Sequence, residues 1–216
     1  MHRPAAGGGS IEFLRGTVGQ QMPSTITSAF SDPADFQAAL QKCGVVEFIP
    51  KRTDAFQARL TQIRLIRLEL LAGGERVPRL AVVTPPAGHV LITFPKKDGG
   101  IQIWDEFAVR PGELVAMSRG YNCWRIVGPT RWGAVMMLAD SLAEYSRAVF
   151  GRHAKLPGPD LSRWRPRRQV FAQLLKLHHA AICRTIRQPE APIDAEAGRG
   201  LEQGLIAALL DSLRSA

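Results

Sequence analysis

Short apolar runs separated by turn-forming residues dominate the sequence between Arg79 and Leu138. The runs are RLAVVT, HVLITF, IQIWDEFAVR, LVAMS, CWRIV and RWGAVMML, and they are divided by PPAG, PKKDGG, PGE, RGYN and GPT. Valine, isoleucine and aromatic residues favour strands, whereas Pro, Gly, Asp and Asn favour turns. Turn signals recur about every 8–12 residues, which is typical of an all-β sandwich or barrel. The block therefore predicts a small β-barrel, and none of its runs is long enough for the helix of a βαβ unit.

The residues before this block predict a tail, a short helix and a strand. Residues 1–30 are rich in Gly, Ala, Ser and Thr, so we expect a flexible amino-terminal tail. Ser31-Asp32-Pro33 supplies the cap and first-turn proline of a helix that Gly44 ends. Between Phe56 and Leu71 the apolar residues fit a helical period, but they also alternate with polar residues. The alternation and the Ala-Gly-Gly that follows favour a strand.

After the barrel block the apolar pattern becomes helical. Asp140 is a predicted cap for a helix over residues 141–150, and a Pro- and Gly-rich basic linker follows it. Two longer amphipathic helices are predicted from about 167 to 187 and from about 200 to 214, with QPEAP between them. Two such helices joined by a short loop form an antiparallel pair. Their apolar stripes are wide enough to need a cover, which is either the barrel or a second subunit.

The charge of the chain is basic and unevenly distributed. The sequence has 28 Lys and Arg against 19 Asp and Glu, a formal net charge of +9. Residues 151–187 contain nine Lys and Arg but only one acidic residue, Asp160, and the excess is concentrated at Arg163–Arg168. Clustered cations attract polyanions such as nucleic acids, although most charge runs are solvated faces. Both interpretations of the segment stay open at this stage.

Cysteine use and hydropathy indicate a cytoplasmic protein. The three cysteines are odd in number and widely spaced, which favours free thiols in a reducing compartment. No apolar run approaches the roughly 18–20 residues that a membrane-spanning helix needs. We therefore expect cytoplasmic localisation without membrane contact.

The sequence shows no catalytic constellation. A catalytic metal in a barrel needs about three protein ligands, yet the five His include no HxH pair, and His178 and His179 point about 100° apart on a helix. GxSxG is absent, and Cys123 has no obvious His partner. The glycine-rich spots lack the Lys-Ser/Thr of a phosphate loop. We expect no metal, no cofactor and no enzymatic activity.

A ligand pocket inside the barrel is the more plausible site. Aromatic and Met side chains are predicted to line it, with two Arg to orient a ligand. The candidates are Arg64, Phe94, Trp104, Met117, Trp124, Arg125, Trp132 and Met136. For each apolar candidate the competing interpretation is that the side chain simply fills the barrel core.

Several stretches in a particular order resemble the amino-terminal sensor region of AraC/XylS-type transcription regulators. They are SDPADFQAAL, FQARLTQIRLIRLELL, the ITFP strand, RPGELV, GPTRWGAVMMLADSLAEYSRAVFG, LLKLHHAAI and RGLEQGLIAALLDSL. The resemblance covers about residues 31–213. It implies an α+β fold, in which a cupin-like β-barrel of the jelly-roll type precedes a carboxy-terminal antiparallel helix pair. The implied division is a tail at 1–30, a sensor barrel at 31–151, a basic linker at 152–166 and a helical dimerisation region at 167–216.

The resemblance also implies a function. Such regulators sense an effector in the barrel, dimerise through helices, and bind promoter DNA with two helix-turn-helix units. Nothing after Ser162 predicts those units, so we expect an effector-sensing and dimerisation module that lacks its own DNA-binding half. A homodimer is expected, through leucines of the helix pair: Leu174, Leu177, Leu201, Leu205 and Leu209. Two alternatives are a cupin-fold enzyme and a free-standing interaction protein that forms mixed dimers with full-length regulators.

Overall fold

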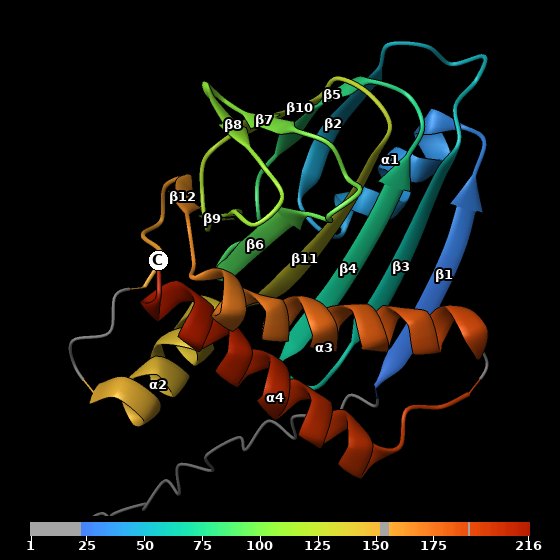
Figure 1. The fold of residues 1–216 in the computed structure, drawn as a ribbon. Helices are drawn as coiled ribbons and strands as arrows, with labels where there is room; N and C mark the ends of the chain where they lie inside the picture. Colours follow the sequence, from blue (N-terminus) through green and yellow to red (C-terminus); the bar gives the residue numbers. More distant parts are fainter. Residues whose placement is uncertain (1–22, 152–155, 190) are drawn as a thin grey trace, which may run out of the picture.

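Two antiparallel β-sheets face each other, and three helices cover the outer side of the larger sheet (Figure 1). A computed structural model describes residues 23–151, 156–189 and 191–216. The seven-stranded sheet consists, in spatial order, of β1 (Ser24–Phe30), β3 (Ala58–Arg64), β4 (Leu68–Glu75), β11 (Thr130–Leu138), β6 (His89–Pro95), β9 (Leu114–Met117) and β12 (Ser162–Trp164). The five-stranded sheet consists of β2 (Val45–Pro50), β5 (Arg79–Val83), β10 (Asn122–Ile126), β7 (Gln102–Trp104) and β8 (Phe107–Val109).

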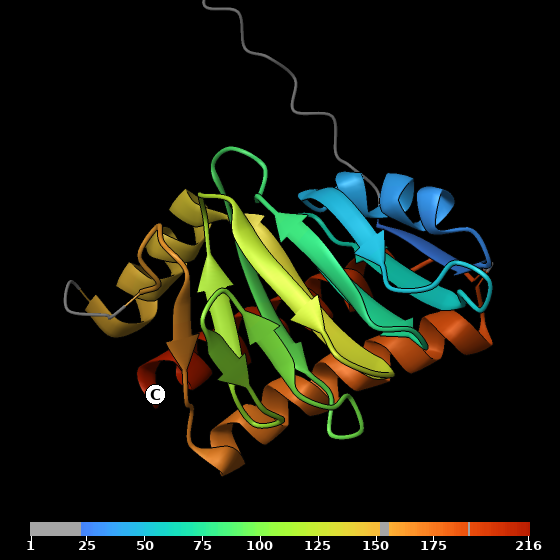
Figure 2. The ribbon, with the colours of Figure 1, turned by 90° about the horizontal axis from the view of Figure 1, so that it is seen from above.

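The helices close the barrel edge and cover one of its faces. They are α1 (Pro33–Gln41), α2 (Ala139–Phe150), α3 (Arg168–Arg187) and α4 (Ala195–Arg214). Helix α1 lies beside β1 and β2, whereas α2, α3 and α4 lie on the side of the seven-stranded sheet that faces away from the five-stranded sheet (Figure 2). The predicted fold class, an α+β fold with a cupin-like barrel followed by a packed helix pair, is confirmed. None of the helices in the described part of the chain is long and apolar enough to cross a membrane.

The structure has two hydrophobic cores, one on each side of the seven-stranded sheet. The first lies between the two sheets and contains the buried rings of Trp104, Trp124 and Trp132. The second lies between the seven-stranded sheet and the helices, where Phe94 of β6 packs edge-on against Phe171 of α3 with 5.7 Å between ring centroids. Because strand side chains alternate between faces, β3, β4, β6, β9 and β11 each contribute to both cores.

The alternating segment after Phe56 is a β-hairpin. It forms β3 and β4 instead of one strand, and the amide of Leu65 donates to the carbonyl of Leu68 across the turn, at 2.9 Å. The prediction of β structure is confirmed, but the turn was missed because residues 65–67 contain neither Gly nor Pro. Ala72-Gly73-Gly74, which we expected to end the strand, lies inside β4.

Three further boundaries differ from the sequence-based expectation. IQIWDEFAVR is a hairpin of β7 and β8, turned at Asp105, whose φ is +44° and whose carboxylate accepts from the amide of Cys123 at 2.7 Å. Residues 24–30 of the predicted tail form β1, and residues 162–164 of the predicted linker form β12. Tail residues 1–22 and linker residues 152–155 lie outside the described residues.

The ends of the short helices follow local capping chemistry, with one correction. Asp32 caps α1 as predicted, since its carboxylate accepts from the amides of Ala34 and Asp35. Asp140 does not cap α2: the N-cap is Leu138, which makes no side-chain cap hydrogen bond, and Asp140 lies in the first turn. Gly151 ends that helix with a φ of +74°, a conformation that favours glycine.

Candidate functional site

The predicted pocket between the sheets is filled by its own lining. Trp104 stacks on Trp124 with 4.9 Å between ring centroids, and Trp132 meets Trp124 edge-on at 5.2 Å. Met117 and Met136 belong to the same buried cluster. The cavity that remains here has a volume of about 20 Å³, which is room for about one water molecule. These five candidates lie together as core residues, and contact between any of them and an effector stays a prediction.

The other three pocket candidates lie outside the space between the sheets. Arg64 is exposed and pairs with Glu69, with 3.4 Å between Nε and Oε1. Arg125 is exposed on the outer face of β10. Phe94 faces α3 on the opposite side of its sheet. Strand alternation assigns each side chain to one of two faces, but only the packing of the sheets decides which face is enclosed.

A buried ion pair connects the two sheets, and the sequence analysis did not find it. Glu75 at the end of β4 and Arg79 at the start of β5 make two hydrogen bonds of 2.8 and 3.1 Å, and both side chains are fully buried. The Trp132 indole donates to Glu75 at 2.8 Å, and Arg79 donates to the carbonyl of Trp124 at 2.9 Å. Every charged atom of the pair therefore has a partner, as a buried ion pair requires.

A few buried polar atoms between the sheets have no partner. In the described part of the chain they include both amide atoms of Gln102 and the indole nitrogens of Trp104 and Trp124. Gln102 and Trp104 lie on the same face of β7, and Trp124 is the cross-strand neighbour of Trp104. Unpaired buried polar groups cost stability, so this corner of the interior favours a water or a polar ligand group when there is room for one.

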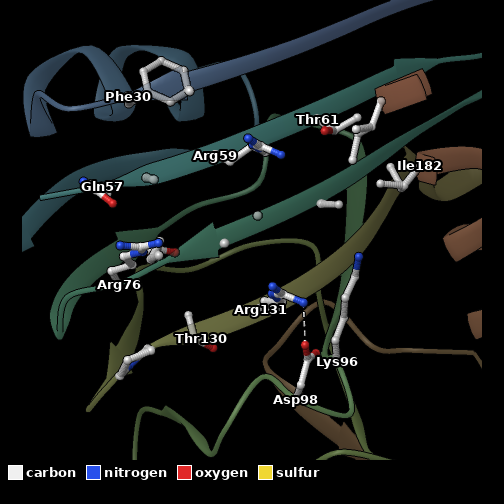
Figure 3. A pocket seen from close by; sticks show the side chains of 18 of the residues that line it. Phe30, Gln57, Arg59, Thr61, Arg76, Lys96, Asp98, Thr130, Arg131 and Ile182 are labelled. Atoms are coloured by element: carbon white, nitrogen blue, oxygen red, sulfur yellow. Dashed lines mark hydrogen bonds and ion pairs between the residues drawn. The ribbon is translucent and has the colours of Figure 1, made fainter. Parts of the chain in front are cut away.

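A large groove lies on the outer face of the seven-stranded sheet, beside α3 (Figure 3). We call it the basic groove, and its volume is about 920 Å³. Its cationic side chains are Arg59, Arg76, Lys96 and Arg131.

The strand register explains the floor of the basic groove. Arg59 of β3 pairs with Gly74 of β4, and Gly74 pairs in turn with Arg131 of β11. The amide of Lys96 donates to the carbonyl of Arg131 at 2.9 Å, which continues the row past the end of β6. Gly74 has no side chain, and a Cβ there would meet nothing nearer than 3.8 Å. The floor is therefore open between two Arg side chains that extend from the same face.

Helix α3 forms one wall of the basic groove. Gly133 lets the helix approach the sheet, because a Cβ at that position would lie 2.9 Å from the imidazole of His178. His178 is buried against Phe94, and its Nε2 lies 2.9 Å from the carbonyl oxygen of Leu71. Burial, with a smaller contribution from the charge of Lys96, lowers the pKa of His178 to about 4. The helix is thus held to the sheet by a neutral imidazole.

The cations of the basic groove have few anionic partners. Arg131 pairs with Asp98 at 2.6 Å. Arg59, Arg76 and Lys96 make no ion pair with any residue that the structure describes. Burial, together with the charge of Arg131, lowers the pKa of the Lys96 ammonium from its ordinary value. The groove therefore carries a local excess of positive charge.

A thiol and an imidazole meet on the helix wall. Cys183 Sγ lies 3.4 Å from Nε2 of His179, four residues earlier on α3. The i,i+4 spacing was visible in the sequence, although only Cys123 was considered there. Within the described ranges no three His, Cys, Asp or Glu side chains are grouped so that they could hold a metal ion.

The leucines predicted for a dimer interface belong to the core of the chain itself. Leu174, Leu205 and Leu209 are fully buried against the seven-stranded sheet, and Leu177 and Leu201 are partly buried beside them. The sequence left two candidates for the surface that covers the apolar stripes of the helices, the barrel and a second subunit. The structure shows that the barrel covers them. The three fully buried side chains are not available to a second subunit, whereas Leu177 and Leu201 are half-buried, and a dimer interface on this helix pair stays a prediction.

The basic segment Arg163–Arg168 is attached to the barrel. Arg163 donates to the carbonyl of Ala108 at 3.0 Å, and Arg165 pairs with Glu113 at 2.7 Å. Part of its charge is thus used within the chain, and contact with nucleic acid stays a prediction.

Comparison with known proteins supports the fold. No protein-family model and no curated protein matches the sequence. The chain is similar to the solved structure of the AraC-like transcriptional activator CuxR, with 14% identity and a TM-score of 0.59, over 89% of this chain and 71% of that chain. Two further similarities are to EutQ of Clostridium difficile (14% identity, TM-score 0.31, 40% of this chain and 72% of that) and HutD of Pseudomonas fluorescens (12% identity, TM-score 0.31, 53% of this chain and 62% of that). At 14% identity the likeness to CuxR shows a shared fold, and the TM-scores of the other two are too low to add to it.

Proposed function

We propose that this chain is the effector-sensing and dimerisation module of an AraC-type transcription regulator, and that it binds its ligand without transforming it. The basic groove is the observation that carries the sensing part of the proposal. Its volume of about 920 Å³ falls within the roughly 300–1,000 Å³ that is usual for small-molecule sites. The fold shared with an AraC-like activator over most of the chain supports the choice of regulator class.

The position of the basic groove suits a sensor. Its floor belongs to β3, β4 and β11, while its wall belongs to α3, which packs against α4. A ligand that touches both floor and wall binds most tightly to the arrangement in which helix and sheet are together. The ligand therefore shifts the equilibrium toward the arrangement in which α3 is packed on the sheet, because it binds that arrangement more tightly than any other. A change in the position of α3 can then alter the surface that a partner contacts.

A thermal-shift screen of a small-metabolite library against the full chain tests this proposal. We expect at least one compound to raise the melting temperature and to be recovered unchanged by mass spectrometry. Gly74→Phe should abolish the shift because the new ring fills the open floor, whereas Met117→Leu, inside the barrel, should retain it. A compound that binds Gly74→Phe as well as the wild type would exclude the groove, and loss of binding in Met117→Leu alone would locate the site between the sheets.

For dimerisation we propose the outer face of the five-stranded sheet. Ile49, Leu80, Arg125 and Ile103 form one cross-strand row there, and its three apolar members are exposed or half-buried. Glu47 on β2 lies in the neighbouring row, opposite Val82, and carries the opposite charge to Arg125. A twofold axis along β5 lays β2 of one subunit over β10 of the other, which brings Glu47 of one subunit next to the row that contains Arg125 of the other. The face therefore presents complementary charges to a second copy of itself.

Light scattering at micromolar concentration is expected to show a dimer for the wild type and a monomer for Leu80→Lys. The substitution places a second cation in the cross-strand row of the proposed face, directly beside Arg125. Val149→Lys on α2 is the matched control, because Val149 is 61% exposed but lies on another surface. A monomeric wild type, or a Leu80→Lys variant that stays dimeric, would contradict the proposed interface.

A further inference from the structure

We infer that the ligand of the basic groove is a small molecule with two anionic groups, carboxylates or phosphates, which Arg59 and Arg131 bind from the two sides of Gly74. The inference rests on the proposed sensing function and names the chemical class of the effector. It depends on the strand register, on the missing counter-charges and on the shape of the groove.

The register places the two guanidinium groups for a bridging ligand. Arg59 and Arg131 extend from the same face of the sheet and are separated by one strand, on which Gly74 lies between them. Neighbouring strands are about 4.8 Å apart, so the two side chains start roughly 10 Å from each other. Figure 3 shows both extending over the floor, with Lys96 beyond Arg131 near α3. A planar guanidinium binds a carboxylate or phosphate with two parallel hydrogen bonds.

The charges of the basic groove are not balanced from within. Asp98 is the carboxylate that pairs with a groove cation, through Arg131, while the carboxylate of Glu75 is occupied by Arg79 and Trp132 in the interior. Four cationic side chains thus line one concavity and repel one another. A dianion neutralises more of this excess than a ligand with one negative charge does, and it is attracted by cations on both sides of the floor.

The shape of the basic groove favours a small molecule over a macromolecular polyanion. The cations line a groove that has the sheet as its floor and α3 on one side, instead of an open ridge that a phosphate backbone could follow. Ile186 of α3, which is 40% exposed, adds apolar surface to the helix wall, whereas Phe30 and Ile182 border the groove but pack mainly into the cores. A carbon framework that carries the two anionic groups has apolar side chains to pack against.

Titration calorimetry with four probes at constant ionic strength tests the inference on the full chain. Succinate and inorganic pyrophosphate present the two anionic chemistries, and butyrate and succinamide provide the singly charged and neutral comparisons. We expect succinate or pyrophosphate to bind more tightly than both comparisons. The probe that binds identifies whether carboxylates or phosphates are recognised.

Variants of the two arginines locate the binding. Each of Arg59→Gln and Arg131→Gln should weaken binding by about tenfold or more, because a charge-assisted contact is lost. Arg59→Lys should lie between Arg59→Gln and the wild type, since it keeps the charge but not the paired hydrogen bonds. Arg184→Gln, an exposed position of α3 that does not line the groove, is the control and should bind like the wild type. Without ligand, Arg59→Gln should melt at or above the wild-type temperature, because Arg59 is exposed and makes no ion pair with a described residue.

The outcomes separate this inference from the proposed function. A neutral library compound whose binding is lost in Gly74→Phe would contradict the inference that the ligand is a dianion. The same result would support the groove as the sensing site. Anion binding that is insensitive to both arginine variants would overturn the assigned site. If no probe and no library compound binds, the sensing function itself fails.

Discussion

Glu75→Gln should lower the free energy of unfolding by about 3–5 kcal/mol, the usual cost of breaking a fully buried ion pair. The substitution keeps the shape of the side chain but removes its charge, so the guanidinium of Arg79 stays buried without a counter-ion. Arg79 also lies over the ring of Trp124, with its Cζ 3.7 Å from the ring centroid. Because Glu75 and Arg79 belong to different sheets, the loss weakens the contact that joins the two halves of the barrel.

Equilibrium denaturation with urea measures this effect, and two further variants interpret it. Asp54→Asn removes the exposed Arg52–Asp54 pair and should leave the denaturation midpoint unchanged. Glu75→Met with Arg79→Met should recover much of the lost stability, because two apolar side chains replace the pair without leaving a buried charge. A Glu75→Gln variant as stable as the wild type would show that Arg79 reaches water and that the pair does not hold the sheets together.

The stability of the wild type should fall by about 3 kcal/mol as the pH decreases from 6.5 to 4, through His178 alone. The pKa of this imidazole is lowered to about 4 in the folded chain, whereas the ordinary value is 6.5. Between these values the unfolded chain binds a proton that the folded chain does not, so acidification favours unfolding. The contribution is fully present above pH 6.5 and is lost as the pH falls to the folded-state pKa.

Urea denaturation across this pH range in the wild type and in His178→Gln isolates the contribution. The variant starts from a lower stability because a packed ring is lost, but its stability should depend less on pH. Burial raises the pKa of Glu69, which acts in the opposite direction and is common to both proteins, so it cancels in the comparison. His179→Gln alters the exposed neighbour and should keep the wild-type slope. Equal slopes for wild type and His178→Gln would contradict a buried neutral imidazole.

Local patterns were sufficient for most secondary-structure elements and insufficient where a turn has no signature. The alternation after Phe56 predicted β structure because side chains on a half-buried strand must alternate. The turns at residues 65–67 and at Asp105 lack Gly and Pro, so two hairpins were each expected to be one strand. Strand β12 is short and basic, and it is held by pairing with β9, which no local pattern reveals.

The candidate site was less predictable than the fold. The three Trp and two Met candidates lie in the barrel core, whereas Phe94 faces α3. The Trp and Met side chains fill the space, which was not predictable because residue types alone do not measure the remaining volume. The leucine stripes of the final helices were recognised, but the sequence left open whether the barrel or a second subunit covers them, and the structure shows the barrel. Arg59 and Arg131 were not considered because each looks like an ordinary exposed Arg on an alternating strand.

The sequence by itself determined the element types, the antiparallel barrel, the helix pair and the uneven basic charge, because each depends on residue type and on periods of a few positions. Only the tertiary structure decided which faces are enclosed and which strands are neighbours. Arg59, Gly74 and Arg131 come from three strands that are distant in sequence, and only the pairing of β4 with both β3 and β11 places them in one row. Alternation assigns a side chain to a face, whereas register and layer packing decide what that face meets.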